Sequence, residues 1–263
     1  MTGKHIRILI SNDDGIYSPG ILALYKELKK LGEVIVVAPD SEKSAVGHAI
    51  TLSSPLRVFP FKRNGKVFGY AVNGTPADCV KIARWAILKD KKVDLVVSGI
   101  NHGSNTGINV IYSGTASAAT EGTILGIPSF AISIATYEPV DFGPAARFAR
   151  RLARIVLKNG LPPETFLNVN VPPVPERDFA GIAITRQGKA VFAEKFDRRV
   201  DPTGKTYYWL TGKKVNLEKE GEDTDDQAIL HNKISITPIH YDMTNYRFLE
   251  ELKTWQISLK TGR

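Results

Sequence analysis

Four short apolar runs without polar alternation recur over the first 160 residues. Strands covered on both faces have this pattern, so each run is predicted to be a buried strand. Two further apolar runs flank Asn64-Gly65, and that dipeptide predicts a tight hairpin between them. The buried runs cover residues 6–10, 34–38, 93–100 and 129–135, and the hairpin runs cover 56–61 and 67–72.

Helix signals alternate with these strands. Ser18-Pro19 and Thr75-Pro76 each place an N-cap residue before a proline, which suits the first helical position because no backbone N–H is needed there. The helix after Thr75-Pro76 is expected to run to about Leu88, and further helices are expected over 114–125 and 144–160. Regular alternation of strand and helix favours an α/β fold with a mostly parallel sheet.

The chain after residue 160 has a different pattern. The segment 187–226 is expected to be loop-rich, and loops of that length serve as an arm, a lid or an interface. A short helix is expected over 245–255. The apolar stretches 166–172, 181–185 and 233–239 are predicted to be strands.

Length and composition fit one globular domain. A chain of 263 residues can bury a sizeable core, and its 43% apolar and 24% charged residues are ordinary for a soluble protein. We therefore expect a single domain over residues 1–263. Residues 1–160 are expected to form the α/β core, and 161–263 a β-rich C-terminal extension rather than an independent domain.

The net charge limits the classes of binding partner to expect, and the cysteine content bears on disulfide bonds. The net charge of +8 suits anionic partners, but the basic residues are scattered and no nucleic-acid motif accompanies them, so nucleic acid is not expected as the main partner. No apolar run is long enough to span a membrane, and the N-terminus lacks a signal-peptide pattern. Cys79 is the only cysteine, which excludes a disulfide framework. We expect a cytoplasmic protein.

Polar clusters follow the predicted strands of the first half. In an open parallel sheet, ligands bind outside the carboxyl ends of the strands, and a doubly wound sheet lets the loops there converge on one crevice. The clusters occupy residues 12–15, 40–48, 98–107 and 113–115.

Asp13 and Asp14 are two adjacent carboxylates at the end of the first strand. Like charges repel, and partial burial raises the cost of ionising both, so a bound cation is the simplest way to satisfy them. The oxygen-rich surroundings favour a hard ion such as Mg²⁺, Mn²⁺ or Ca²⁺. The alternative is that one Asp caps the following turn while the other faces solvent.

Two further clusters suit an anion. Asn101 and Asn105 lie among three glycines, whose backbone can approach a ligand closely, although an ordinary Gly/Asn turn is the alternative. Ser113-Gly114-Thr115 opens a predicted helix and offers free backbone N–H groups together with two hydroxyls. A plain helix N-cap is the alternative there.

A cation site facing an anion site is the arrangement of metal-assisted phosphoester chemistry. The metal polarises a phosphoryl oxygen and orients water, while backbone amides and Asn side chains stabilise the growing charge. Asn12, Asn105, Ser113, Gly114 and Thr115 are the predicted phosphate-binding residues.

Five segments together resemble the SurE family, the survival-protein nucleotidases. They are "ILISNDDGIYSPGI", "VVAPDSEKSAVGHAIT", "NGTPADCV", "DLVVSGINHGSNTG" and "YSGTASAATEG", in family order across residues 8–132. The resemblance implies a Rossmann-like three-layer core and a C-terminal arm that swaps between subunits of a homodimer or homotetramer. It also implies a metal-dependent phosphomonoesterase that hydrolyses nucleoside 5′-monophosphates to nucleoside and phosphate. Nucleoside 3′-monophosphates and short polyphosphate are expected as further substrates of the same site.

The resemblance also implies residue roles. One divalent metal ion per subunit would be held by Asp13, Asp14, Ser44 and Asn101, of which Ser44 comes from the resemblance alone. Asp13, Asp14 and Asn101 are the predicted catalytic residues. Some family members carry a His four residues after an Asp in a "TPLHxD"-like segment, but Tyr246 stands at that spacing here, so no role carries over.

Two rival functions use similar residues. An aspartyl-phosphate mechanism would make Asp13 or Asp14 the nucleophile, although Gly15 breaks the Asp-x-Asp spacing that haloacid-dehalogenase phosphatases use. A non-catalytic nucleotide-binding or phosphoacceptor switch would need a third Asp and a Lys after later strands, and neither occurs there. The base preference, the 5′ or 3′ preference, the metal, the nucleophile, the general acid and the choice of dimer or tetramer stay open.

Overall fold

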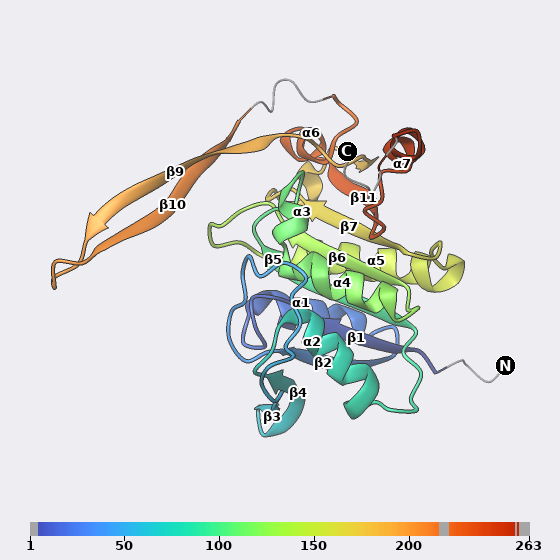
Figure 1. Cartoon of the computed structure of the whole chain (residues 1–263). Helices are drawn as coiled ribbons and strands as arrows, with labels where there is room; N and C mark the ends of the chain where they lie inside the picture. The colour runs from blue at the N-terminus through green and yellow to red at the C-terminus, as the bar shows by residue number, and fades with distance from the viewer. Residues whose placement is uncertain (1–4, 216–220, 256, 258–263) are drawn as a thin grey trace.

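The computed structural model describes residues 5–215, 221–255 and 257 (Figure 1). Nine strands form one sheet in the order β3-β4-β2-β1-β5-β6-β7-β11-β8, and β9 and β10 form a separate two-stranded sheet. The strands of the first half are β1 (Arg7–Ser11), β2 (Glu33–Pro39), β3 (Val58–Arg63), β4 (Lys66–Val72), β5 (Leu95–His102) and β6 (Ser129–Ile134). Those of the second half are β7 (Thr165–Val171), β8 (Ile182–Ile184), β9 (Val191–Val200), β10 (Thr206–Val215) and β11 (Ile234–His240).

The centre of the sheet is parallel, as the sequence predicts. β4, β2, β1, β5, β6 and β7 all run in one direction, whereas β3 and β11 are antiparallel to their neighbours β4 and β7. Ser11 at the end of β1 pairs with Ser98 in β5, so the residues that follow β1 emerge beside the last residues of β5. This register sets the position of the candidate site.

Helices cover both faces of the sheet and give three layers (Figure 1). On one face, Ile8 and Ile10 pack into a core with residues of α1 (Pro19–Leu28) and α5 (Gly143–Asn159). On the other, Leu9 packs into a second core with residues of α2 (Pro76–Ile82) and α4 (Gly114–Ile124). The alternation of β1 between two cores explains why its sequence is continuously apolar. The Rossmann-like fold class is confirmed.

The helices and turns begin at the residues where local sequence signals predict them. Ser18 caps α1 by accepting a hydrogen bond from the Ile21 N–H (3.2 Å). Asn64 and Gly65 both have positive φ, as the two-residue hairpin between β3 and β4 requires. The helix expected to reach about Leu88 is α2 followed by a π-helical segment, Ala83–Ile87.

The second half of the chain completes the same sheet. β7 adds parallel to β6, β11 adds antiparallel to β7, and β8 adds parallel to β11. The remaining helices are α3 (Asn109–Tyr112), a 3-10 turn at Glu176–Asp178, α6 (Asp225–Leu230) and α7 (Tyr246–Lys253). No helix in the described ranges is long and apolar enough to cross a membrane.

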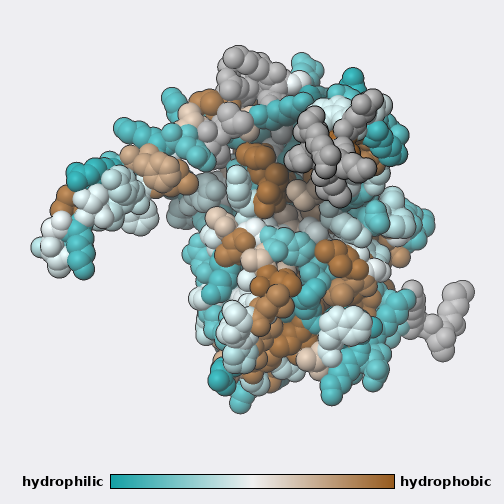
Figure 2. Space-filling view, in the orientation of Figure 1, coloured by the Kyte–Doolittle hydropathy of each residue, from teal (hydrophilic) through white to brown (hydrophobic). Residues whose placement is uncertain are grey.

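The prediction that 187–226 is loop-rich is wrong. β9 and β10 pair antiparallel over their whole length, from Val191↔Val215 to Val200↔Thr206, and form an arm that projects from the body (Figure 1). Most of β10 is exposed, so no row of side chains faces a core. Figure 2 accordingly shows hydrophobic and hydrophilic residues interspersed along the arm. A strand without a buried face leaves no alternating pattern to detect.

Candidate functional site

Three of the polar clusters predicted at strand ends meet in the structure. Asp13 follows β1, and its Oδ1 accepts a hydrogen bond from the Thr115 hydroxyl in the first turn of α4. The backbone N–H of His102, at the end of β5, is close enough to Asp14 to favour the ionised form of its carboxyl group. The carboxylate pair therefore lies between the end of β5 and the N-terminus of α4.

The first turn of α4 approaches Asp13 closely because residue 114 is glycine. A Cβ at this position would lie 2.7 Å from the Cβ of Asp13 and 3.0 Å from its Oδ2. Ser113 caps the helix, since its Oγ accepts a hydrogen bond from the Ala116 N–H (3.0 Å). The positive end of the helix dipole thus faces the carboxylate pair, where an anion is also favoured.

Both carboxylates are costly to ionise where they lie. Asp13 is only 4% exposed, and burial raises its pKa against the opposing hydrogen bond from Thr115. Burial and the charges of Asp13 and Glu42 raise the pKa of Asp14 to about 7. The nearby backbone N–H of His102 lowers this pKa, but by less. Among the described residues, neither carboxylate is paired with a lysine, arginine or histidine. Two uncompensated carboxylates are a donor set that fits a hard divalent cation.

The loop after β2 reaches the pair through its backbone. The N–H of Lys43 donates to the carbonyl oxygen of Asp13 (2.8 Å), which brings the neighbouring Ser44 towards the site. Ser44 is exposed, and its Oγ donates to Oε1 of Glu42 (2.6 Å). Glu42 was missed by the sequence analysis, although it is an acidic residue within a strand-end loop. No three His, Cys, Asp or Glu side chains of the described part group to hold a metal, so other oxygen donors would have to complete a ligand set built on the carboxylate pair.

The three predicted asparagines occupy different positions. Asn101, at the end of β5, is half-buried and donates from Nδ2 to the carbonyl oxygen of Gly103 (2.7 Å). Asn12 is buried and donates from Nδ2 to the Gly15 carbonyl and to the Ser18 hydroxyl, both at 3.0 Å. These bonds fix the turn after β1. Asn12 Oδ1 is buried without a hydrogen-bond partner in the described ranges, and phosphate contact by this side chain stays a prediction.

Asn105 anchors its loop to the sheet. Its Nδ2 donates to the Ser133 hydroxyl (2.8 Å), and its backbone N–H donates to Oδ1 of Asn170 (2.8 Å). The amide of Asn168 donates to the Asn105 carbonyl (2.7 Å). The side chain is 6% exposed, so the structure gives it a supporting position, and its predicted role in phosphate binding is untested.

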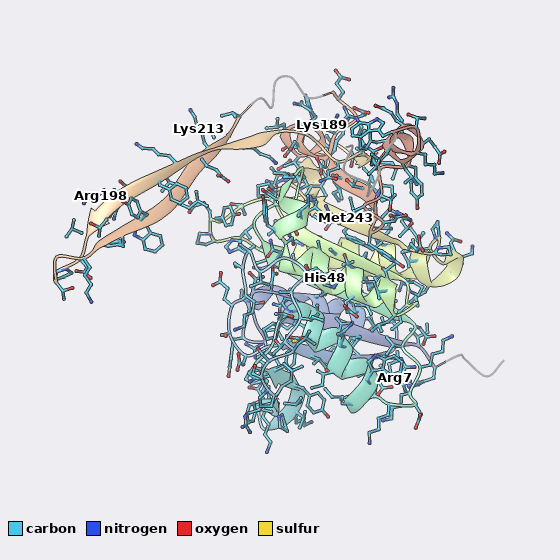
Figure 3. All side chains as sticks on the ribbon, viewed as in Figure 1. Arg7, His48, Lys189, Arg198, Lys213 and Met243 are labelled. Carbon is cyan, nitrogen blue, oxygen red and sulfur yellow. The ribbon has the colours of Figure 1, made fainter. Side chains whose placement is uncertain are left out.

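The two histidines of the strand-end loops are held differently. His48 Nε2 lies 3.0 Å from Oε2 of Glu121 in α4, and Lys81 donates to the other oxygen of this buried carboxylate (2.6 Å). Figure 3 shows His48 over this helix. His102 Nε2 lies 2.8 Å from the carbonyl oxygen of Glu138. Glu121 was not recognised in the sequence analysis, because nothing local distinguishes it from other helical glutamates.

Known proteins are similar to this chain over most of its length. Residues 8–194 match the family model described as "Survival protein SurE". The protein named 5′-nucleotidase SurE from Syntrophus aciditrophicus is 56% identical over 248 residues, which cover 94% of this chain and 93% of that protein. The protein of the same name from Syntrophobacter fumaroxidans is 52% identical over 252 residues, covering 96% and 100%.

A solved structure extends the similarity to the fold. The crystal structure of the SurE protein from Aquifex aeolicus superposes with a TM-score of 0.82 at 44% identity, covering 94% of this chain and 98% of that one. The match of sequence over nearly the whole length, and of fold with it, assigns the chain without ambiguity: it belongs to the SurE family.

Proposed function

We propose that the chain is a 5′-nucleotidase, a metal-dependent phosphomonoesterase that hydrolyses nucleoside 5′-monophosphates to nucleoside and phosphate. The observation that carries the proposal is the meeting of the uncompensated carboxylates of Asp13 and Asp14 with the N-terminus of α4. The curated relatives named 5′-nucleotidase SurE, about half identical over nearly the full chain, support the same activity.

The donor set supports one divalent ion, Mg²⁺, Mn²⁺ or Ca²⁺, per subunit. Asp13, Asp14, Ser44 and Asn101 would hold it through carboxylate, hydroxyl and amide oxygens, which are the ligands these hard cations prefer. When bound, such an ion polarises a phosphoryl oxygen and lowers the pKa of a coordinated water.

The residues of the chain bind and orient the phosphoryl group. The backbone N–H groups at the start of α4, beside Ser113 and Gly114, point out of the helix end, where they can bind an anion. They would stabilise the negative charge that grows on the equatorial oxygens of the phosphoryl group during the reaction. The Thr115 hydroxyl fixes one rotamer of Asp13. Asp13, Asp14 and Asn101 are therefore the residues proposed to support the chemical step.

Two finer features belong to the same proposal. The site is proposed also to accept 3′-monophosphates and short polyphosphate, because the backbone donors of α4 would contact only the phosphoryl end of a substrate. The chain is proposed to assemble as a homodimer or homotetramer through its arm, on which Phe196, Tyr208, Trp209 and Leu210 are each more than half exposed. Apolar groups so exposed on an extended ribbon favour a protein contact.

The experiment is phosphate release from a panel of nucleoside 5′- and 3′-monophosphates and tripolyphosphate. Each reaction is run in EDTA and again after Mg²⁺ or Mn²⁺ is restored. Release that stops with chelator and returns with metal is the expected result, and the panel ranks the substrates. Binding of nucleotide without release under every metal would overturn the proposal in favour of a nucleotide-binding switch.

A further inference from the structure

We propose that Asp225 and Lys214 are positioning residues for the reaction, because they hold the loop 103–107 at the root of the arm. This loop directly follows β5, which contains Asn101, and leads through α3 to Ser113. The inference rests on the proposed hydrolase function and assigns part of its machinery to the C-terminal extension.

Asp225 clamps the loop from the start of α6. Its Oδ2 accepts a hydrogen bond from the Gly107 N–H (2.9 Å), while Oδ1 accepts from the N–H groups of Gly188 and Asp226, both at 2.9 Å. Gln187 completes the clamp by donating from Nε2 to the Gly107 carbonyl (2.8 Å). Both backbone polar groups of Gly107 are therefore bound by side chains from beyond residue 180.

Lys214 ties the same loop to the arm. It is the next-to-last residue of β10, and its Nζ donates to the Thr106 hydroxyl (2.9 Å) and to Oδ1 of Asp226 (2.6 Å). The side chains of Lys214 and Asp226 are 15% and 7% exposed. A largely buried ion pair that also binds a neighbouring hydroxyl restricts all three groups to one arrangement.

The opposite side of the loop is anchored to the sheet. Asn105 binds Ser133 and Asn170, while Gly103 donates from its N–H to the Ile134 carbonyl (3.0 Å). The loop is thus fixed between two supports, the sheet and the arm root. Without the second support, Gly103 and Asn105 are still bound to the sheet and the Gly47 N–H still donates to the Tyr112 carbonyl (3.0 Å), but the side-chain contacts to Thr106 and Gly107 are lost. The chain between these two anchors is then less restricted, and it leads through α3 to Ser113.

Asp225 acts through this loop rather than by contact with substrate. It is fully buried, and its oxygens are occupied by three backbone N–H groups. Small displacements of groups that support a transition state reduce turnover strongly, and about 1 Å can cost on the order of a hundredfold. The predicted effect therefore falls on kcat more than on KM.

The test compares Lys214→Met and Asp225→Asn with the wild-type protein. Lys213→Met is the matched control, since Lys213 is the adjacent, exposed residue on the arm (Figure 3) and the variant loses the same charge. Steady-state kinetics with a nucleoside 5′-monophosphate at saturating metal, well below each melting temperature, give kcat and KM. Hydrogen exchange over residues 103–112 reports the loop without requiring activity.

We expect Lys214→Met and Asp225→Asn to lower kcat at least about tenfold with KM within about threefold, and to speed exchange over 103–112. Lys214→Arg should recover part of kcat, and Lys213→Met should match wild type. Values of kcat and exchange within twofold of Lys213→Met in both variants would overturn the inference. If Asp225→Asn does not fold, Lys214→Met decides alone. Absence of wild-type turnover would refute the proposed function instead, and the exchange comparison would still test the clamp.

Discussion

The hydroxyl of Thr115 donates a hydrogen bond to Oδ1 of Asp13, and this contact joins the first turn of α4 to the end of β1. Both residues are buried. The bond holds the carboxylate in one orientation before any ligand arrives, so it is a direct target for substitution.

Replacement of Thr115 by Val keeps the shape of the side chain but removes its donor. The Asp13 carboxylate then loses a buried partner, and we expect kcat to fall about tenfold. Thr115→Ser retains the hydroxyl and is the control. The measurement is steady-state phosphate release, and equal kcat values for the two variants would show that the bond is irrelevant to turnover.

Substitution of the carboxylate pair or of the loop asparagine should abolish turnover without unfolding the protein. Asp13→Asn removes a charge from the proposed metal site, and Asn101→Ala removes its amide oxygen. Phosphate release and circular dichroism are measured together, with Asp178→Asn on a remote exposed turn as the control. Unchanged activity of either variant at saturating metal would contradict the site assignment.

Gly114→Ala tests the close approach of the helix. The added Cβ would lie 2.7 Å from the Cβ of Asp13, so the helix or the carboxylate must move. We expect a loss of stability of about 1–3 kcal/mol and a fall in kcat of at least about tenfold. Denaturant unfolding and kinetics measure the two effects. A variant with wild-type kcat would mean that this approach is not needed for catalysis.

Stability at acidic pH should depend on Asp78. Burial opposes ionisation of this carboxyl, but hydrogen bonds from Thr51 and Thr75 outweigh burial and lower its pKa from 3.8. Because the folded pKa lies below the unfolded one, the stabilisation is full above pH 3.8 and is lost as pH falls through the folded pKa. Asp78→Asn should therefore be less stable by about 1 kcal/mol at pH 7.

Urea unfolding of wild type and Asp78→Asn across the acidic range checks this. The difference in the free energy of unfolding should shrink as pH drops below 3.8. A difference that stays constant down to the lowest pH at which both proteins fold would exclude a contribution from the charge of Asp78.

If the chain assembles through its arm, the oligomeric state should depend on the exposed aromatic residues there. Trp209 is 57% exposed on β10, and burial of its ring against another copy would stabilise an oligomer. Trp209→Lys should lower the mass measured by light scattering, whereas Lys213→Met should not. A wild-type protein that is monomeric at micromolar concentration would refute assembly through the arm.

The parts of the fold that the sequence predicts well are those set by neighbouring residues. Ser18-Pro19 begins α1, and Asn64-Gly65 forms a turn, because capping and positive φ are decided locally. The buried strands are equally clear, since burial on both faces leaves an uninterrupted apolar run. The two strands of the arm were not predicted, because most of their residues are exposed and leave no apolar alternation.

The candidate site divides in the same way. The carboxylate pair and the start of α4 follow from strand-end chemistry, and the structure brings them together. The sequence does not predict which atoms each residue uses for hydrogen bonds. The side-chain amide of Asn12 donates to the turn after β1, and that of Asn105 donates to Ser133 in the sheet. Ser44 carries no local signal, and Asp225 reaches the loop only through the tertiary fold.

The hydrogen bond between Gly107 and Asp225 spans 118 positions of the chain. During synthesis, the loop 103–107 is complete long before the residue that clamps it leaves the ribosome. Such a long-range closure is slow, because the entropy of the intervening chain must be lost first. A nascent chain that ends before α6 therefore has the strand-end motifs without the contacts from Asp225 to the loop, and those contacts form only after α6 has been synthesised.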